Sequence, residues 1–107
     1  MNVAAAGFDW GDGNRRKCQK HGVTIIEIEG LFRRPFSVLP DSAHSKKEER
    51  LKAIGITPSG RRVLIVFTLH VHRDVALVCP ISAWYMHRKE VAHYEEQTAK
   101  AEKTSDS

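Results

Sequence analysis

Apolar residues recur at helical spacing between Thr24 and Pro35. Four of them fall at intervals of three and four, as expected for one buried helix stripe: Ile25, Ile28, Leu31 and Phe32. Thr24 and Glu27 form a capping-box pattern, in which hydroxyl and carboxylate each accept a free backbone N–H. Because proline cannot continue a helix, the pattern predicts an amphipathic helix between Thr24 and Pro35.

Shorter elements precede this helix. Phe8-Asp9-Trp10 predicts a brief extended segment, which the run Gly11-Asp12-Gly13 interrupts. Asn14 to Lys20 then predicts a basic helix that ends at His21-Gly22, with the glycine in the position that commonly ends helices.

Strand patterns follow Pro35. Phe36 to Leu39 predicts a short strand that ends at Pro40, and Asp41 to Glu49 predicts a polar loop. Arg50 to Thr57 and Arg62 to Leu69 predict a hairpin, because the turn signal Pro58-Ser59-Gly60 separates them.

The second half of the chain continues the sheet and ends in a helix. Val63 to Phe67 is apolar on both faces and is therefore expected at the centre of the sheet. Asp74 to Ser82 predicts a last strand, in which Pro80 indicates an edge or a bulge. A final helix is expected from near Trp84 to Lys100, with one side formed by Ala83, His87, Val91 and Tyr94.

These elements together predict an α+β fold: N-terminal helices, a mostly antiparallel sheet of about four strands and a C-terminal helix. The chain has 107 residues, enough for one domain. We expect a flexible N-terminus over residues 1–7, a single domain over 8–100 and a disordered polar tail over 101–107.

Charge and composition narrow the partners. Seventeen Lys and Arg residues against thirteen Asp and Glu give a net charge of +4, which favours RNA, DNA or an acidic protein as partner. No apolar run is long enough to cross a bilayer, and Met1 to Gly7 lacks the basic cluster of a signal peptide, so we expect a cytoplasmic protein. Cys18 and Cys79 form no CxxC motif and are expected as free thiols.

Histidines and arginines supply the candidate chemistry. RNA is one of the partners that the net charge allows, and its metal-free cleavage would use the 2′-hydroxyl as nucleophile. Such cleavage needs cations such as arginine at the phosphate and a group such as histidine to move protons. His70 and His72 alternate on an extended chain and would share a face with Thr68. With Arg73 they are either a proton-transfer or RNA-contact group, or polar residues at an exposed strand end. A zinc site there would need a third ligand, and the sequence indicates none.

The other cations also have two interpretations each. Arg61 and Arg62 precede the central strand as phosphate contacts or as solvated residues. His87, Arg88 and Lys89 lie near the start of the last helix, where positive charge opposes the helix dipole; this cost indicates a functional use, and a solvated helix face is the alternative. His21 is expected to be structural, and Trp84-Tyr85 stacks on a base or packs in a core or interface. The basic first helix contacts RNA backbone or an acidic protein partner, or is an ordinary exposed face; its cations are Arg15, Arg16, Lys17 and Lys20.

The order and spacing of several motifs resemble the BrnT toxins, over residues Phe8 to about Glu96. The motifs are Phe8-Asp9-Trp10, Lys20-His21-Gly22-Val23 leading to Thr24 and Glu27, Phe32 to Pro35, His44-Ser45 with Glu48-Glu49-Arg50, Ala53-Ile54-Gly55, Gly60-Arg61, Phe67-Thr68, Ile81-Ser82-Ala83, Glu90 and Tyr94.

The resemblance implies a RelE/ParE-like fold and a cytoplasmic ribonuclease that slows translation without a cofactor or metal. It also implies a cognate BrnA-type antitoxin. A toxin–antitoxin heterotetramer is one assembly that this pairing allows. DNA would be contacted only through the complex. The candidate catalytic residues are Arg61, His70, Arg73, Arg88 and Lys89. The candidate RNA-binding residues are Arg15, Arg16, Lys17, Lys20, Arg62, His72 and His87.

The sequence departs from the family at three places that often hold arginine: His70, Cys79 and Trp84 stand there, and Arg73 is a candidate replacement for one of them. Two hypotheses therefore stay open. The chain is an active endoribonuclease, or it is a toxin-like module that binds the antitoxin and has lost catalysis. DNA binding by this chain alone is a weak third, because no helix-turn-helix pattern stands out.

Overall fold

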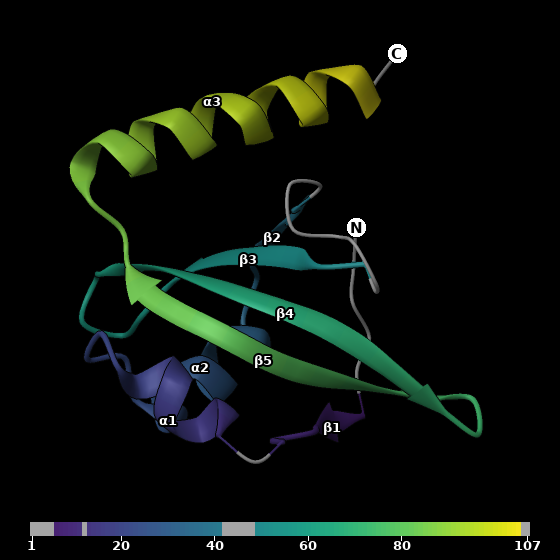
Figure 1. The fold of residues 1–107 in the computed structure, drawn as a ribbon. Helices are drawn as coiled ribbons and strands as arrows, with labels where there is room; N and C mark the ends of the chain where they lie inside the picture. The colour runs from purple at the N-terminus through teal and green to yellow at the C-terminus, as the bar shows by residue number, and fades with distance from the viewer. Residues whose placement is uncertain (1–5, 12, 42–48, 106–107) are drawn as a thin grey trace.

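The structure is a computed structural model that describes residues 6–11, 13–41 and 49–105 (Figure 1). Its elements in chain order are β1 (Gly7–Phe8), α1 (Asn14–Gln19), α2 (Ile25–Phe32), β2 (Ser37–Pro40), β3 (Leu51–Ile56), β4 (Arg62–His72), β5 (Val75–Tyr85) and α3 (Arg88–Ser105). The predicted polar loop after Asp41 falls mostly on residues 42–48, which lie outside the described residues.

One five-stranded sheet organises the fold, in the order β1-β5-β4-β3-β2. β2 to β5 pair antiparallel, and β4 is central, as its apolar sequence predicts. The α+β class is therefore confirmed, but the prediction of about four mostly antiparallel strands missed a fifth. β1 lies parallel to β5 through Gly7 and Phe8. A strand of two residues is too short to show alternation in sequence.

α2 begins as its capping box predicts. The Thr24 hydroxyl accepts a hydrogen bond from the Glu27 N–H, and the Glu27 carboxylate accepts one from the Thr24 N–H, each at 3.1 Å. The helix ends at Phe32, ahead of Pro35, and its stripe buries Ile28 and Leu31 against the sheet.

Helices lie on both sides of the sheet (Figure 1). α1 and α2 cover one face, over a core that includes Cys18, Ile28, Ile65 and Phe67. The opposite face carries a smaller cluster, formed by Ile54, Leu64, Val66 and Ile81, against which Trp84, Met86 and Tyr94 pack. α3 runs on this second side and is tied to the sheet partly by polar contacts: the Lys52 ammonium donates to the Tyr94 hydroxyl at 2.9 Å.

Two tight turns connect the long strands, and the first of them lies at the predicted turn signal Pro58-Ser59-Gly60. Between β3 and β4, the Gly60 N–H donates to the Thr57 carbonyl at 2.9 Å, and Gly60 has φ +85°, which a glycine adopts without strain. Between β4 and β5, Arg73 and Asp74 both have positive φ, 52° and 65°, as in the two-residue turns whose twist suits a hairpin.

A β-bulge lies next to Pro80, which confirms the bulge interpretation of this proline. Phe67 pairs with Pro80, whereas Val66 pairs with Ser82, so Ile81 is an extra residue in β5. β5 as a whole lies between β4 and β1, but β1 pairs only with Leu77 and Val78, so Pro80 stands at a local edge and the edge interpretation also holds there. Proline is tolerated here because the ladder with β1 reaches only Val78, before the missing N–H would matter.

The predicted start of the last helix, near Trp84, is wrong. Trp84 and Tyr85 continue β5 and pair with Leu64 and Val63, so Ala83 is also a strand residue and shares no helix face with Val91. α3 begins at Arg88 and ends at Ser105, beyond the predicted end at Lys100. No described helix is long and apolar enough to span a membrane.

Candidate functional site

An open pocket of about 510 Å³ lies where four parts of the chain meet. It is lined by His21, Arg61, Trp84, Tyr85, His87 and Glu90. His21 follows α1, Arg61 ends the β3–β4 turn, Trp84 and Tyr85 end β5, and His87 and Glu90 stand at the start of α3. We call this the Arg61 pocket.

Arg61 is held by stacking on an aromatic ring. Its guanidinium carbon lies 3.5 Å from the centre of the Tyr85 ring. The Tyr85 hydroxyl in turn donates to a Glu27 carboxylate oxygen at 2.7 Å. The same oxygen accepts from the Thr24 N–H and the Thr24 hydroxyl, each at 3.1 Å. The capping carboxylate of α2 thus fixes the ring that supports Arg61.

The protonation of this cluster follows from its contacts. Burial alone would raise the pKa of Glu27, but hydrogen bonds from Tyr85 and Thr24, with the nearby Arg61 charge, outweigh it and lower that pKa below 4.5. The bond to Glu27 raises the pKa of Tyr85 above 10.0, with smaller contributions from burial and from the Glu27 charge, while Arg61 opposes the shift. An anionic Glu27 and a neutral, donating Tyr85 are therefore favoured together.

The second carboxylate of the pocket is also engaged. Glu90 accepts from the Trp84 indole N–H and from the His87 backbone N–H, each at 3.3 Å. Glu90 thereby joins the end of β5 to the first turn of α3 and holds the His87 segment beside Arg61. Glu27 and Glu90 are thus each engaged by protein donors, and no salt bridge among the described residues joins either of them to Arg61.

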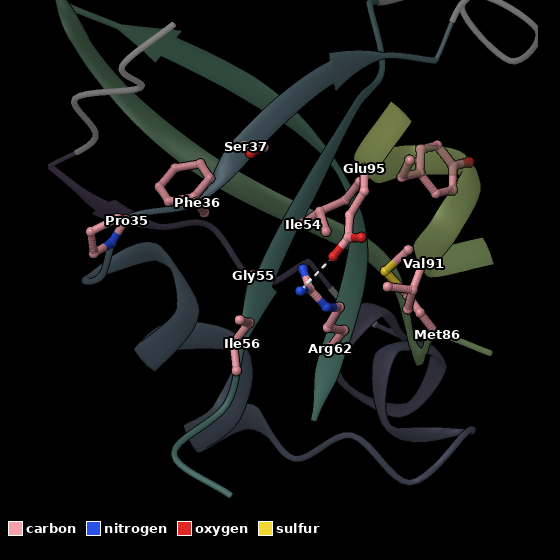
Figure 2. A pocket seen from close by; sticks show the side chains of 11 residues that line it. Pro35, Phe36, Ser37, Ile54, Gly55, Ile56, Arg62, Met86, Val91 and Glu95 are labelled. Atoms are coloured by element: carbon pink, nitrogen blue, oxygen red, sulfur yellow. Dashed lines mark ion pairs between the residues drawn. The ribbon is translucent and has the colours of Figure 1, made fainter. Parts of the chain in front are cut away.

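The structure brings some predicted residues to this pocket. Arg61 and His87 line it, and Arg88 and Lys89 follow as exposed residues that open α3. Arg62, in contrast, pairs with Glu95 of α3 and lines a different pocket of about 370 Å³, between α3 and the ends of β2 and β3 (Figure 2).

His70, His72 and Arg73 lie toward the other end of β4. From Arg62 to His70 the strand spans about 26 Å at its usual rise. His70 Nδ1 lies 2.9 Å from an Asp9 carboxylate oxygen, and its Nε2 lies 3.4 Å from the Thr68 hydroxyl. His72 and Arg73 are exposed at the hairpin end. The predicted catalytic set is therefore divided between two places too far apart to contact one phosphate.

The cations of α1 form a third group. Arg15 lies over the Trp10 ring, with 5.5 Å between guanidinium carbon and ring centre, and Trp10 donates to Glu29 at 3.0 Å. The other three, Arg16, Lys17 and Lys20, are exposed. None of the four lines the Arg61 pocket.

Sequence reasoning missed the link between Glu27 and Tyr85. The capping box placed Glu27 correctly at the start of α2, but the two residues are 58 positions apart and nothing in the sequence joins them. His21, expected to be only structural, lines the pocket as an exposed side chain. Its position beside the helix-ending Gly22, which has φ +91°, was the available signal.

Metal and thiol chemistry have little support among the described side chains. No group of three or more His, Cys, Asp and Glu residues in residues 6–11, 13–41 and 49–97 could hold a metal ion. Cys18 and Cys79 are both buried thiols, and neither is in a disulfide among the described residues, as predicted. Burial raises the pKa of Cys18 to about 11, the nearby Cys79 adds to the rise, and Lys17 opposes it.

Comparisons with known proteins identify a family. A search of curated proteins finds no match to the chain. The family model for the ribonuclease toxin BrnT, of type II toxin–antitoxin systems, matches residues 10–90. This range contains every residue of the Arg61 pocket as well as His70. The chain therefore belongs to the BrnT family of ribonuclease toxins.

Proposed function

We propose that this protein is an endoribonuclease toxin that cleaves RNA without a metal ion and does so in the Arg61 pocket. One observation carries the proposal: a guanidinium fixed on the Tyr85 ring lies in the same open pocket as two imidazoles, those of His21 and His87. The pocket thus contains a phosphate-binding group and proton-transfer groups together. We also propose, as part of the same assignment, that the fold is RelE/ParE-like.

The reaction assigns a task to each group. The substrate 2′-oxygen loses its proton to one imidazole and attacks the adjacent phosphorus. The bond to the 5′-oxygen breaks, the leaving oxygen takes a proton from the second imidazole, and a 2′,3′-cyclic phosphate remains. Arg61 donates to the phosphate oxygens on which charge grows. Trp84 offers an aromatic surface for a neighbouring base, and Arg88 and Lys89 bind the RNA backbone.

The proposed partners follow from the family. The toxin cleaves RNA, slows translation and is neutralised by a BrnA-type antitoxin. One form of their complex is a toxin–antitoxin heterotetramer. DNA is contacted only by that complex. The net charge of +4 supports both an RNA substrate and an acidic antitoxin segment.

The test is cleavage by the purified full chain on a defined RNA, with excess chelator present. We expect cleavage to continue with chelator and to fall by about 10²-fold or more in Arg61→Ala, a loss typical of a group that stabilises charge in the transition state. Thermal unfolding of both proteins checks that the variant is folded. Two results would contradict the proposal: loss of wild-type cleavage when chelator is added, or undiminished cleavage by Arg61→Ala.

A second candidate is an antitoxin-binding module without catalysis. Two positions that often hold arginine in the family contribute to packing here: Cys79 is buried, and Trp84 packs on the cluster of Ile54 and Leu64. Neither can replace a cation at a phosphate. A folded chain that binds its antitoxin but neither cleaves RNA nor arrests growth would favour this candidate.

A further inference from the structure

A groove between α2 and the end of β3 has two exposed apolar side chains on it. Ile26 is 84% exposed and Ile56 is 47% exposed, although most large apolar residues of the described chain are buried. Both line a pocket of about 300 Å³, together with Glu27, Leu31, Arg33, Arg34 and Pro58 among others. We call this the Ile26 groove. Ile56 also borders the pocket beneath α3, so apolar surface continues past the groove (Figure 2).

The fold does not require Ile26. α2 packs on the sheet through the stripe that buries Ile28 and Leu31, and Ile26 lies off that stripe. Leu31 already fills the space above Gly55, where an added Cβ would lie 2.7 Å from its Cγ. Single exposed apolar residues are common, whereas two that line one groove form a joint apolar surface that a partner can cover.

The groove also has a charge. Arg33 and Arg34 end α2 as exposed side chains, and Arg34 donates to the Ile56 carbonyl at 3.4 Å. No salt bridge between described residues engages either arginine. The one carboxylate that lines the groove, Glu27, is held by Thr24 and Tyr85. Along its described lining the groove therefore has apolar surface beside two exposed arginines and one hydrogen-bonded carboxylate, so its cations outnumber its anions.

We propose that the Ile26 groove binds an acidic amphipathic segment of the antitoxin. An apolar side chain of that segment packs between Ile26 and Ile56, and its carboxylates pair with Arg33 and Arg34. The inference rests on the proposed function for the identity of the partner. It also gives a route to inhibition: Glu27 lines the groove and binds Tyr85, so a bound segment ends beside the Arg61 pocket.

The test measures affinity of the full chain for the antitoxin encoded next to it, using purified proteins. Ile26→Asp and Arg33→Glu should each weaken binding by about tenfold or more, as substitutions in a central contact do. An acidic residue in the first turn of α2 suits the helix dipole, so Ile26→Asp should remain folded. Arg33→Glu should also lower the dependence of affinity on salt.

Two matched variants complete the test. Val71→Asp makes the same apolar-to-acid change at a residue 71% exposed on the far end of β4. Arg16→Glu makes the same charge reversal on α1, the alternative acidic-segment site. Both should bind within about twofold of wild type if the groove is the contact. Wild-type affinity in both groove variants, or a loss only in Arg16→Glu, overturns the groove while leaving the antitoxin partnership intact. No binding by the wild-type chain overturns both.

Discussion

The guanidinium carbon of Arg61 lies 3.5 Å from the centre of the Tyr85 ring, whose hydroxyl donates to Glu27 at 2.7 Å. A guanidinium stacked on a ring is fixed in orientation while the N–H donors at its edge stay available for a phosphate. Because Tyr85 and Thr24 occupy the Glu27 oxygen, that carboxylate holds the ring without a bidentate pair to Arg61. Tyr85 thus lies between the Glu27 carboxylate and the Arg61 guanidinium within one cluster.

This arrangement predicts that Arg61→Lys is not a conservative change. Lysine keeps the charge but has neither the planar group that stacks on Tyr85 nor the forked donors that grip a phosphate. We expect kcat/KM for RNA cleavage to fall by about tenfold to a hundredfold, less than in Arg61→Ala. Steady-state kinetics on one RNA substrate measures it. Full activity in Arg61→Lys would mean that only the charge matters.

The Glu27–Tyr85 bond predicts how stability depends on pH. The folded pKa of Glu27 is lowered, so its contribution is present above 4.5 and is lost as pH falls through the folded value. The folded pKa of Tyr85 is raised, so its contribution is present below 10.0 and is lost as pH rises through the folded value. The bond therefore stabilises the protein between these limits.

Tyr85→Phe removes the donor and should lower the free energy of unfolding at pH 7 by about 1–2 kcal/mol. The difference from wild type should shrink as pH falls through the folded pKa of Glu27, which lies below 4.5. Denaturant unfolding at pH 7 and at pH 3 measures both values. A constant difference across that range would show that lost packing, and not the bond to Glu27, explains the effect.

Local patterns in the sequence predicted most of the fold. The capping box of Thr24 and Glu27, the turn before Gly60 and the doubly apolar strand from Val63 to Phe67 each specify structure through neighbouring residues, and each is confirmed. The errors came where distant pairing decides. Trp84 and Tyr85 remain in β5 because Leu64 and Val63 pair with them, which no local pattern shows.

The candidate site was predicted less well for the same reason. The sequence selected suitable residue types, yet it could not show that Arg61 precedes β4 while His70 lies near the far end of that eleven-residue strand. Glu27, Tyr85 and Arg61 come from three distant segments that meet only after the sheet forms. Residue types predict what chemistry is available, whereas register determines which of them share a pocket.

Gly55 predicts a steric requirement in β3. An added Cβ would lie 2.7 Å from Leu31 Cγ and 2.9 Å from Leu31 Cδ1, closer than carbon atoms approach. Gly55→Ala should therefore destabilise the protein by about 1–3 kcal/mol through overpacking. Leu31→Ala alone should also destabilise, but it should cost less in the Gly55→Ala background. Additive losses in the double mutant would contradict a direct clash.

Cys18 predicts slow thiol chemistry. It is fully buried, and burial together with the adjacent Cys79 raises its pKa to about 11. Because the thiolate is the reactive form, the native protein should resist alkylation at pH 8, while the unfolded chain should react at both cysteines. Mass spectrometry after timed treatment measures this. Rapid labelling of Cys18 in the native state would be inconsistent with the buried position.

The last prediction decides which imidazole serves catalysis. His87 lines the Arg61 pocket, whereas His70 lies toward the other end of β4 and contacts Asp9 at 2.9 Å. If cleavage occurs in the Arg61 pocket, His87→Ala should reduce the rate by about 10²–10⁴-fold, the usual size of a general acid–base contribution. His70→Ala should then keep activity within about threefold, since a strand segment of about 26 Å separates it from the start of β4. The reverse result, a large loss in His70→Ala with little change in His87→Ala, would place the chemistry at the Asp9–His70 pair. In that case Asp9→Asn should reproduce the loss, because the carboxylate orients the ring, and Arg61→Ala should have little effect.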